Sequence, residues 1–227
     1  MNKDDYTKCA QGVWSEAQKV EYSLWEAEPP DGNDWNSWWA SKFNNYQTLN
    51  EVKAETVLEI GCGPYAKNLD LVINSLKSYP SNLILNDPLL DKYVSSGKSV
   101  SRYLGKSTLI SKPFELCDES EIPLKSVDVA ICNNVLDHVY DVDLLLHNAY
   151  KCLKDGGYFI FGQDLKNPTD QGWDQFFPAH PIRVDHDYLD HLLADKYHQV
   201  LYKILPRDEG RNSAYHYGTY IFIGKKR

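Results

Sequence analysis

The chain has 227 residues and a formal net charge of −8 at pH 7, with 42% hydrophobic and 25% charged residues. This length and composition predict one globular domain that buries its own core, with or without a helical appendage. Nucleic-acid affinity rests largely on lysine and arginine at phosphates, so the acidic charge argues against a DNA or RNA partner. No window approaches the roughly 18 apolar residues of a membrane span and no secretory leader is visible, so a cytoplasmic protein is expected.

The cysteines are odd in number, and no two of them have the C-x-x-C spacing of a metal or redox site. This pattern predicts reduced thiols in a cytosolic protein. We therefore assign no disulfide and no metal ligand from the sequence. The five positions are Cys9, Cys62, Cys117, Cys132 and Cys152.

Residues 1–52 are rich in aromatic side chains and predict a helical cap on a core domain of residues 53–227. Two helices are expected, over about 13–27 and 34–48, with the breaker segment 28–32 between them. In the second helix Trp35, Trp39, Phe43 and Tyr46 recur on one face. The favoured interpretation is that the tryptophans of the cap bury a helical face on the core. The alternative is a lid that lines an acceptor pocket.

From residue 56 onward, predicted strands alternate with helices. Strands are expected at 56–60, 83–85, within 107–117, and at 127–132, 158–161, 198–204 and 215–223, with helices at 68–76, 141–153 and 187–196. Such alternation predicts parallel strands with helices on both faces, while the polar turn at 207–210 predicts antiparallel pairing of the last two strands. The predicted fold is α/β, a Rossmann-like, doubly wound and mostly parallel seven-stranded sheet with an antiparallel last strand.

A glycine turn and a carboxylate follow the first two predicted strands. The turn is Gly61-Cys62-Gly63, and Asp87 closes the second strand. Ligands of doubly wound sheets bind at the carboxyl ends of the strands, where glycine lets the backbone approach a ligand and a carboxylate suits two ribose hydroxyls. Each feature alone also fits a plain strand-to-helix turn, since Asp87-Pro88 is a good helix start.

Three further segments follow in order: residues 117–129, residues 133–139, and Leu153-Lys154-Asp155-Gly156-Gly157. Together with Glu59 before the glycine turn and Asp87 at the second strand end, they closely resemble the class I S-adenosylmethionine-dependent methyltransferases that act on small molecules. The resemblance covers about residues 55–163. It implies S-adenosylmethionine as the cofactor, and these cofactor-binding residues: Glu59, Gly61, Cys62, Gly63, Asp87, Asp118, Glu119 and Asn133.

By this resemblance, Gly61 and Gly63 approach the cofactor, and Glu59 faces the methionine amino group directly or through water. Asp87 holds the ribose. Asp118 accepts from the adenine amino group with Glu119 beside it. Asn133 lines the methionine end with its main chain.

The chain departs from the family pattern at three positions. Tyr65 stands where the third glycine of the turn is usual, so the loop is expected to sit differently. Cys117 replaces the glycine before Asp118, which leaves the adenine assignment the weakest. Asp155 replaces a proline, which a turn tolerates.

A general base is useful when the methyl acceptor is a hydroxyl, and histidine titrates in the suitable range. His138 stands where the family commonly has a histidine, although a structural role is at least as common there. His180 follows the fifth predicted strand, in a segment that is placed to cover an acceptor. These two are the candidate catalytic residues.

Three alternatives stay open. Gly61 to Ala66 fits G-x-G-x-x-A, so an NAD(P)-binding oxidoreductase is the main rival. Glu59 argues against it, since a carboxylate suits an ammonium better than a pyrophosphate. A nucleic-acid methyltransferase is the second rival, although the residues after the fourth strand lack the Asn/Asp-Pro-Pro-Tyr/Phe motif of base-amino methyltransferases. The third alternative is a non-catalytic relative that binds the cofactor as a subunit or sensor.

The sequence therefore predicts a methyltransferase that acts on oxygen or nitrogen of a small polar acceptor. A sugar or nucleotide-linked sugar of surface polysaccharide is one candidate. The oligomeric state is not indicated by any pattern in the chain.

Overall fold

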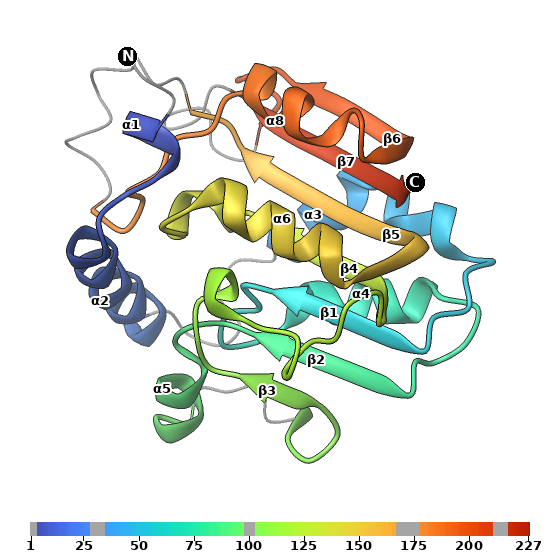
Figure 1. Cartoon of the computed structure of the whole chain (residues 1–227), viewed down its shortest axis with the longest axis horizontal. Coiled ribbons are helices and arrows are strands. Elements are labelled where there is room, and N and C mark those ends of the chain that lie inside the picture. Colours follow the sequence, from blue (N-terminus) through green and yellow to red (C-terminus); the bar gives the residue numbers. More distant parts are fainter. Residues whose placement is uncertain (1–3, 28–34, 98–102, 167–177, 211–217) are drawn as a thin grey trace.

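The computed structural model describes residues 4–27, 35–97, 103–166, 178–210 and 218–227, and one seven-stranded sheet forms its centre (Figure 1). The strand order is β3-β2-β1-β4-β5-β7-β6. The strands are β1 (Thr56–Ile60), β2 (Asn82–Asn86), β3 (Thr108–Ile110), β4 (Val127–Asn133), β5 (Leu153–Asp164), β6 (Tyr197–Leu205) and β7 (Thr219–Lys226).

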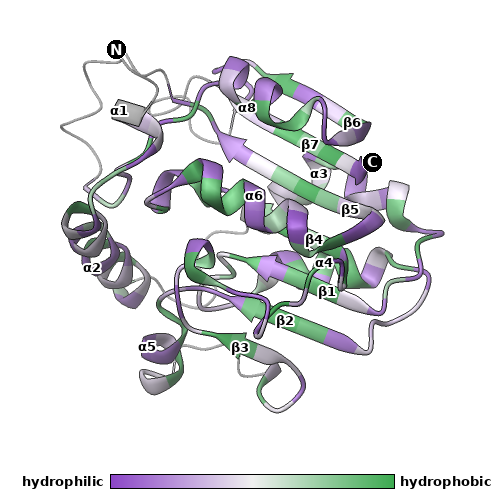
Figure 2. Cartoon of the chain, in the orientation of Figure 1, coloured by the Kyte–Doolittle hydropathy of each residue, from purple (hydrophilic) through white to green (hydrophobic). Residues whose placement is uncertain are grey.

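The first five strands pair in parallel, and β7 pairs antiparallel with both β5 and β6. The predicted fold is therefore confirmed, including its antiparallel last strand. Strands covered by helices on both faces need apolar side chains in both directions. Val57, Leu58 and Ile60 of β1 are accordingly buried, and hydrophobic residues dominate the central strands (Figure 2).

Helices cover both faces of the sheet. α6 (Val142–Cys152) and α8 (His186–Leu193) pack on one face, while α3 (Trp35–Lys42), a 3₁₀ segment η1 (Asn44–Leu49) and α4 (Lys67–Ser75) pack on the other (Figure 1). Aspartates begin the first two of these helices. Asp141 accepts a hydrogen bond from the Leu144 amide, and Asp185 accepts one from the Tyr188 amide, which satisfies donors that a helix start leaves open.

The predicted helix over 34–48 is wrong as a single element. α3 ends at Lys42, and Asn44, Asn45 and Tyr46 have φ values of 53°, 50° and 56°. Asparagine tolerates this left-handed conformation better than most residues. Phe43 and Tyr46 still pack on the sheet, stacked with ring centroids 5.3 Å apart, so burial of aromatic surface holds a bend that a continuous helix would not contain.

The first two helices of the chain lie at the edge of the sheet, beyond the ends of its strands. α1 (Asp4–Thr7) and α2 (Gln11–Ala27) run beside the carboxyl ends of the strands, to the left of the arrowheads in Figure 1. A small helix, α5 (Leu90–Ser95), follows β2 near the same edge. The predicted cap of residues 1–52 thus has two parts in space, one at the sheet edge and one on the sheet face. Its division from residues 53–227 stays a prediction. Among the described helices, none has the length and apolarity to cross a membrane.

Gly162 of β5 is closely packed between Trp39 on the sheet face and Asn133 at the end of β4. A Cβ built at this residue of β5 would lie 2.6 Å from the Trp39 ring and would overlap the Asn133 side-chain oxygen. Gly162→Ala is therefore expected to lower the free energy of unfolding by about 1–3 kcal/mol, because the core there has no space to yield. Urea unfolding followed by circular dichroism measures this change.

Gly12→Ala is the matched control for this substitution, since no heavy atom of the described residues lies within 4 Å of a Cβ at Gly12 in α2. A helical glycine replaced by alanine should stay within about 1 kcal/mol of the parent or gain stability. Equal effects of the two variants would show that Gly162 is not tightly packed.

Candidate active site

The glycine turn closes β1 against its neighbours. Gly61 and Gly63 have φ values of 64° and 57°, a region that side chains with a Cβ rarely adopt. A Cβ on Gly61 would lie 2.5 Å from a methyl group of Val135, which follows β4. The amide of Cys62, between them, donates to the Asn86 carbonyl at 3.0 Å. The turn is thereby fixed to both neighbouring strands, β2 and β4.

Asp87 is the carboxylate of this edge. Its Oδ2 accepts a hydrogen bond from the Gly63 amide at 3.0 Å, and its Oδ1 accepts one from the Leu89 amide at 2.8 Å. The side chain is buried, and burial raises the pKa of Asp87 to about 6, although the two amide hydrogen bonds favour the charged form. Each oxygen keeps a lone pair, so the carboxylate can accept from a further donor.

Glu59 and Asn133 belong to the ends of β1 and β4 at the same edge. Glu59 is 1% exposed, and its charge adds to burial in raising the pKa of the Tyr46 hydroxyl, which places the two side chains near each other. The Asn133 amide donates to Asn68 of α4 at 3.3 Å. Its Oδ1 is buried and has no hydrogen-bond partner among the described residues. This oxygen lies against Gly162 of β5, near the Trp39 ring, and is enclosed there.

Asp118 and Glu119 lie on the loop after β3. Cys117 brings this loop to the end of β2, with its sulfur 3.8 Å from the Asn86 amide nitrogen. The Asp118 side chain accepts from the Ser120 amide at 2.8 Å and from the Ser120 hydroxyl at 2.5 Å. These bonds lower the pKa of Asp118. Glu119 lies 3.6 Å from the Lys151 ammonium. Contact of either side chain with an adenine stays a prediction.

One face of α2 covers the carboxyl edge. The Trp25 ring lies edge-on to Tyr65 at 6.0 Å, and Tyr22 stacks on Tyr93 at 5.9 Å. Trp14 and Gln18 donate from their side chains to the His138 carbonyl at 2.9 and 3.0 Å. Helical spacing places these α2 residues on one side. Two of the cap tryptophans thus lie over the loops of the edge, whereas Trp39 is buried on the sheet face.

The two candidate catalytic histidines lie together. The rings of His138 and His180 are 4.4 Å apart and perpendicular. Behind them Lys166 is 3% exposed, with its Nζ 2.6 Å from Asp137 Oδ2 and 2.7 Å from His180 Nδ1. Burial opposes the Asp137 charge, but Lys166 and the histidines outweigh it and hold the pKa of Asp137 well below its usual range. Neither Lys166 nor Asp137 was expected here from the sequence.

Glu21 was not expected either. It extends from α2, where the Trp25 indole donates to its Oε1 at 2.7 Å, and its Oε2 lies 3.5 Å from His138 Nδ1. Its charge also contributes to the raised pKa of Asp87. Glu21 therefore lies near both Asp87 and the histidine pair. Its spacing from Trp14, Gln18 and Trp25 on one helix face is the only sequence signal for it.

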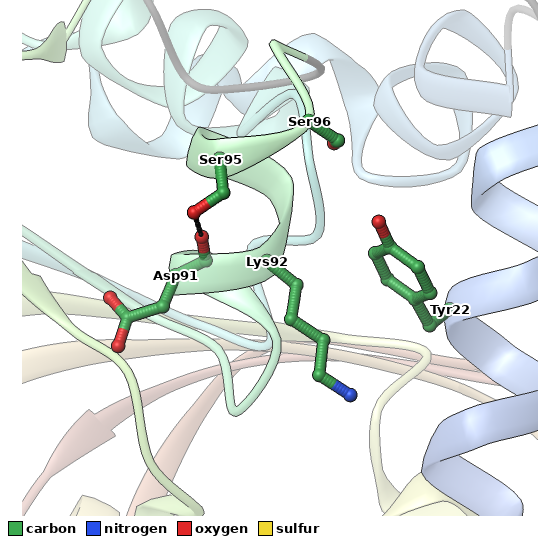
Figure 3. Close-up of a pocket in the computed structure, with 5 residues that line it drawn as sticks. All are labelled: Tyr22, Asp91, Lys92, Ser95 and Ser96. Carbon is green, nitrogen blue, oxygen red and sulfur yellow. Dashed lines mark hydrogen bonds between the residues drawn. The ribbon is translucent and has the colours of Figure 1, made fainter.

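A surface depression of about 500 Å³ lies between α2 and α5 (Figure 3). Its lining residues are Tyr22, Asp91, Lys92, Ser95 and Ser96, none of which was predicted from the sequence to belong to the site. In Figure 3 the Tyr22 ring and the Lys92 side chain face one another across it, and the Lys92 ammonium lies 5.4 Å from the ring centroid. The depression borders the α2 cover rather than the glycine turn.

Comparison of the chain with known proteins identifies its family. A family model described as a methyltransferase domain matches residues 39–203, well over half of the chain. The chain belongs to the methyltransferase domain family. No curated protein matches it by sequence.

Solved methyltransferases share the fold. The N-methyltransferase NodS of Bradyrhizobium japonicum WM9, solved with S-adenosyl-L-homocysteine, superposes with a TM-score of 0.66 at 16% identity, over 93% of this chain and 98% of that one. The Burkholderia thailandensis 1,6-didemethyltoxoflavin-N1-methyltransferase gives 0.62 at 14% identity, over 96% of this chain and 91% of that one. The predicted class I methyltransferase family is confirmed, and this fold uses S-adenosylmethionine.

The buried Asp137–Lys166 pair gives this methyltransferase-domain protein a stability test. Asp137→Asn would leave the Lys166 ammonium buried without its carboxylate, so the free energy of unfolding should fall by about 3–5 kcal/mol. Urea unfolding is the measurement. Glu16→Gln is the control, because its ion pair with Lys19 on α2 is exposed on both sides and solvent screens it. If both variants unfold at the same urea concentration, the buried pair does not stabilise the edge.

Proposed function

We propose that this protein transfers a methyl group from S-adenosylmethionine to oxygen or nitrogen of a small polar acceptor. The observation that carries the proposal is the convergence of the Gly61–Gly63 turn, Asp87 and Asn133 at the adjacent carboxyl ends of β1, β2 and β4, with two histidines beside them. The relatives that share the fold include enzymes that methylate nitrogen of small molecules.

The residues present fit such a cofactor. Gly63 is open on its outer side, because only the Trp25 ring among the described residues would come within 4 Å of a Cβ at this position. Asp87 retains acceptor capacity for ribose hydroxyls. Asn133 ends β4 beside the end of β1, where its main chain would line the methionine end. Glu59, buried near the end of β1, suits an ammonium group. When bound, S-adenosylmethionine supplies an electrophilic methyl group on sulfur.

The chain's own contribution to the reaction is positioning and proton handling. In-line alignment of acceptor and methyl group supplies much of the acceleration of such a transfer. The α2 face, with Trp25 over the glycine turn, would exclude water from that alignment. We assign to His138 and His180 the uptake of a proton lost from an acceptor hydroxyl, and the closeness of their rings supports this assignment. A sugar or nucleotide-linked sugar remains one candidate acceptor.

The ribose assignment is tested by Asp87→Ala. Loss of two charge-assisted hydrogen bonds, each worth about 1.5–3 kcal/mol, should weaken S-adenosylhomocysteine binding at least about 100-fold in isothermal calorimetry. Asp195→Ala is the matched control, because this carboxylate is exposed in the turn after α8. Unchanged affinity in a folded Asp87→Ala variant would contradict the assignment.

The raised pKa of Asp87 gives a pH dependence. The charged form accepts from both ribose hydroxyls, and its population falls as the pH drops through about 6. Affinity for S-adenosylhomocysteine should therefore decline by up to about tenfold for each pH unit below about 6 and be constant from about pH 7 to 8. Asp87→Asn, which cannot titrate, should remove this slope. A slope that persists in that variant would assign it to another group.

Binding and activity measurements on the same protein samples distinguish the alternative functions. Tight NAD(H) binding without S-adenosylhomocysteine binding would contradict the proposal and favour an oxidoreductase. Cofactor binding with no methyl transfer to any of a broad panel of hydroxyl and amine acceptors would favour a non-catalytic relative. A salt-sensitive complex with RNA or DNA would favour a nucleic-acid substrate.

A further inference from the structure

Three side chains from distant parts of the chain converge at the carboxyl edge of the sheet. Glu21 comes from α2, His138 from the 3₁₀ turn η4 (Leu136–His138) after β4, and His180 from the segment before α8. One nitrogen or oxygen atom from each lies within 4.8 Å of the other two. All three residues are partly buried. Two histidines and one carboxylate are the ligand set of open zinc sites in enzymes.

The separation between Glu21 and His138 fits two metal ligands better than a hydrogen bond. Glu21 Oε2 lies 3.5 Å from His138 Nδ1. A charge-assisted N–H···O hydrogen bond measures about 2.7–2.9 Å. Two ligands bound at about 2.0–2.2 Å to a tetrahedral zinc ion lie about 3.3–3.5 Å apart. His138 Nδ1 is moreover buried and has no hydrogen-bond partner among the described residues.

Asp137 lies behind both histidines, at distances from their rings that are longer than hydrogen bonds. Its Oδ1 lies 3.8 Å from His138 Nε2, and its Oδ2 lies 3.5 Å from His180 Nδ1. One carboxylate thus faces one nitrogen of each ring, which directs His138 Nδ1 and His180 Nε2 as the ligand atoms. Histidine ligands usually donate their second N–H to such a carboxylate, which fixes the ring and the tautomer.

Lys166 sets the tautomer when no metal is bound. Its Nζ lies 2.7 Å from His180 Nδ1, so the ammonium donates there and the ring proton stays on Nε2. Coordination through Nε2 would move that proton to Nδ1. The Lys166 ammonium would then have to turn away from the ring and donate to Asp137 alone, and Asp137 would accept from Nδ1. The ring remains neutral throughout. The Asp137–Lys166 ion pair would therefore be kept both with and without the metal ion.

We propose that Glu21, His138 and His180 bind a divalent transition-metal ion of the zinc type. Three protein ligands leave a fourth position open, which is typical of catalytic zinc sites. A hydroxyl or amine of the methyl acceptor would occupy that position and be polarised there. With the ion bound, this polarisation would replace the uptake of the acceptor's proton by the two histidines. This role rests on the proposed methyltransferase function, whereas metal binding itself does not. Because Glu21 belongs to α2, the ion would also fasten the α2 cover to the sheet edge.

The test uses the full chain, stripped with a chelator and dialysed into metal-free buffer. Calorimetric titration with zinc chloride should give one tight site per chain. His138→Ala, His180→Ala and Glu21→Gln should each weaken it at least about tenfold. His147→Ala is the matched control, because this histidine is exposed on α6 outside the cluster, and it should bind zinc as the parent does. Magnesium, which prefers oxygen ligands, should not compete.

Two further measurements keep the result decisive. Glu21→Gln changes only one side-chain group on a surface helix, so its effect stands even if a histidine variant fails to fold. Cobalt(II) should give the strong visible absorption of a tetrahedral site, lost in His180→Ala. Zinc binding that is equal in the parent and in all three variants would mean an adventitious ion only and would overturn the proposal, as would absence of binding.

S-adenosylhomocysteine is titrated into the same samples. If it binds and zinc does not, the metal site falls and the proposed function stands. If zinc binds as predicted and the cofactor product does not, the metal site stands and the proposed function falls.

Discussion

The hydrogen bond between the Gly63 amide and Asp87 joins the two strands on which the rest of the edge depends. It ties the turn after β1 to the end of β2, and it requires a backbone with positive φ at Gly61 and Gly63. Val135 fills the space that a side chain on Gly61 would occupy, so the segment after β4 is positioned against the same turn. A buried carboxylate costs free energy unless it is hydrogen-bonded. The two amides that Asp87 accepts from offset part of that cost and leave its remaining lone pairs at the edge.

The α2 helix covers both the glycine turn and the histidine pair at this edge. One of its faces contacts the glycine turn through Trp25, Tyr93 through Tyr22, and the His138 carbonyl through Trp14 and Gln18. These contacts are aromatic or single hydrogen bonds, each worth about 0.5–1.5 kcal/mol, so the helix is held by several modest interactions. Glu21 projects from the same face, so its approach to His138 depends on these contacts.

The fold followed from patterns that local physics controls. Alternating apolar strands and helices, aspartate caps and glycine turns each act over a few residues, so the seven strands and the positions of Gly61, Gly63 and Asp87 at the edge could be predicted. The bend at Asn44–Asn45 could not, because burial of Phe43 and Tyr46 on the sheet overrides a helical aromatic pattern. Lys166 and Glu21 were missed because Asp137 and His138, which they meet at the edge, lie 29 or more residues away along the chain. Asp118 was assigned by family spacing; its side chain accepts hydrogen bonds from Ser120 of its own loop, and its contact with adenine stays a prediction.

The buried Asp137–Lys166 pair is better explained by positioning than by stability. An apolar pair of similar volume would often stabilise a core as well or better, because two charges lose their hydration on burial. The pair instead sits in a network: Gln163 donates to Asp137 and accepts from the Leu136 amide, and the Asp137 carbonyl accepts from the Ile182 amide. This network fastens the segment that carries His180 to the turn that carries His138. Two rings brought together from positions 138 and 180 need such a fixed frame, since neither lies on a strand or a long helix that would hold it rigidly.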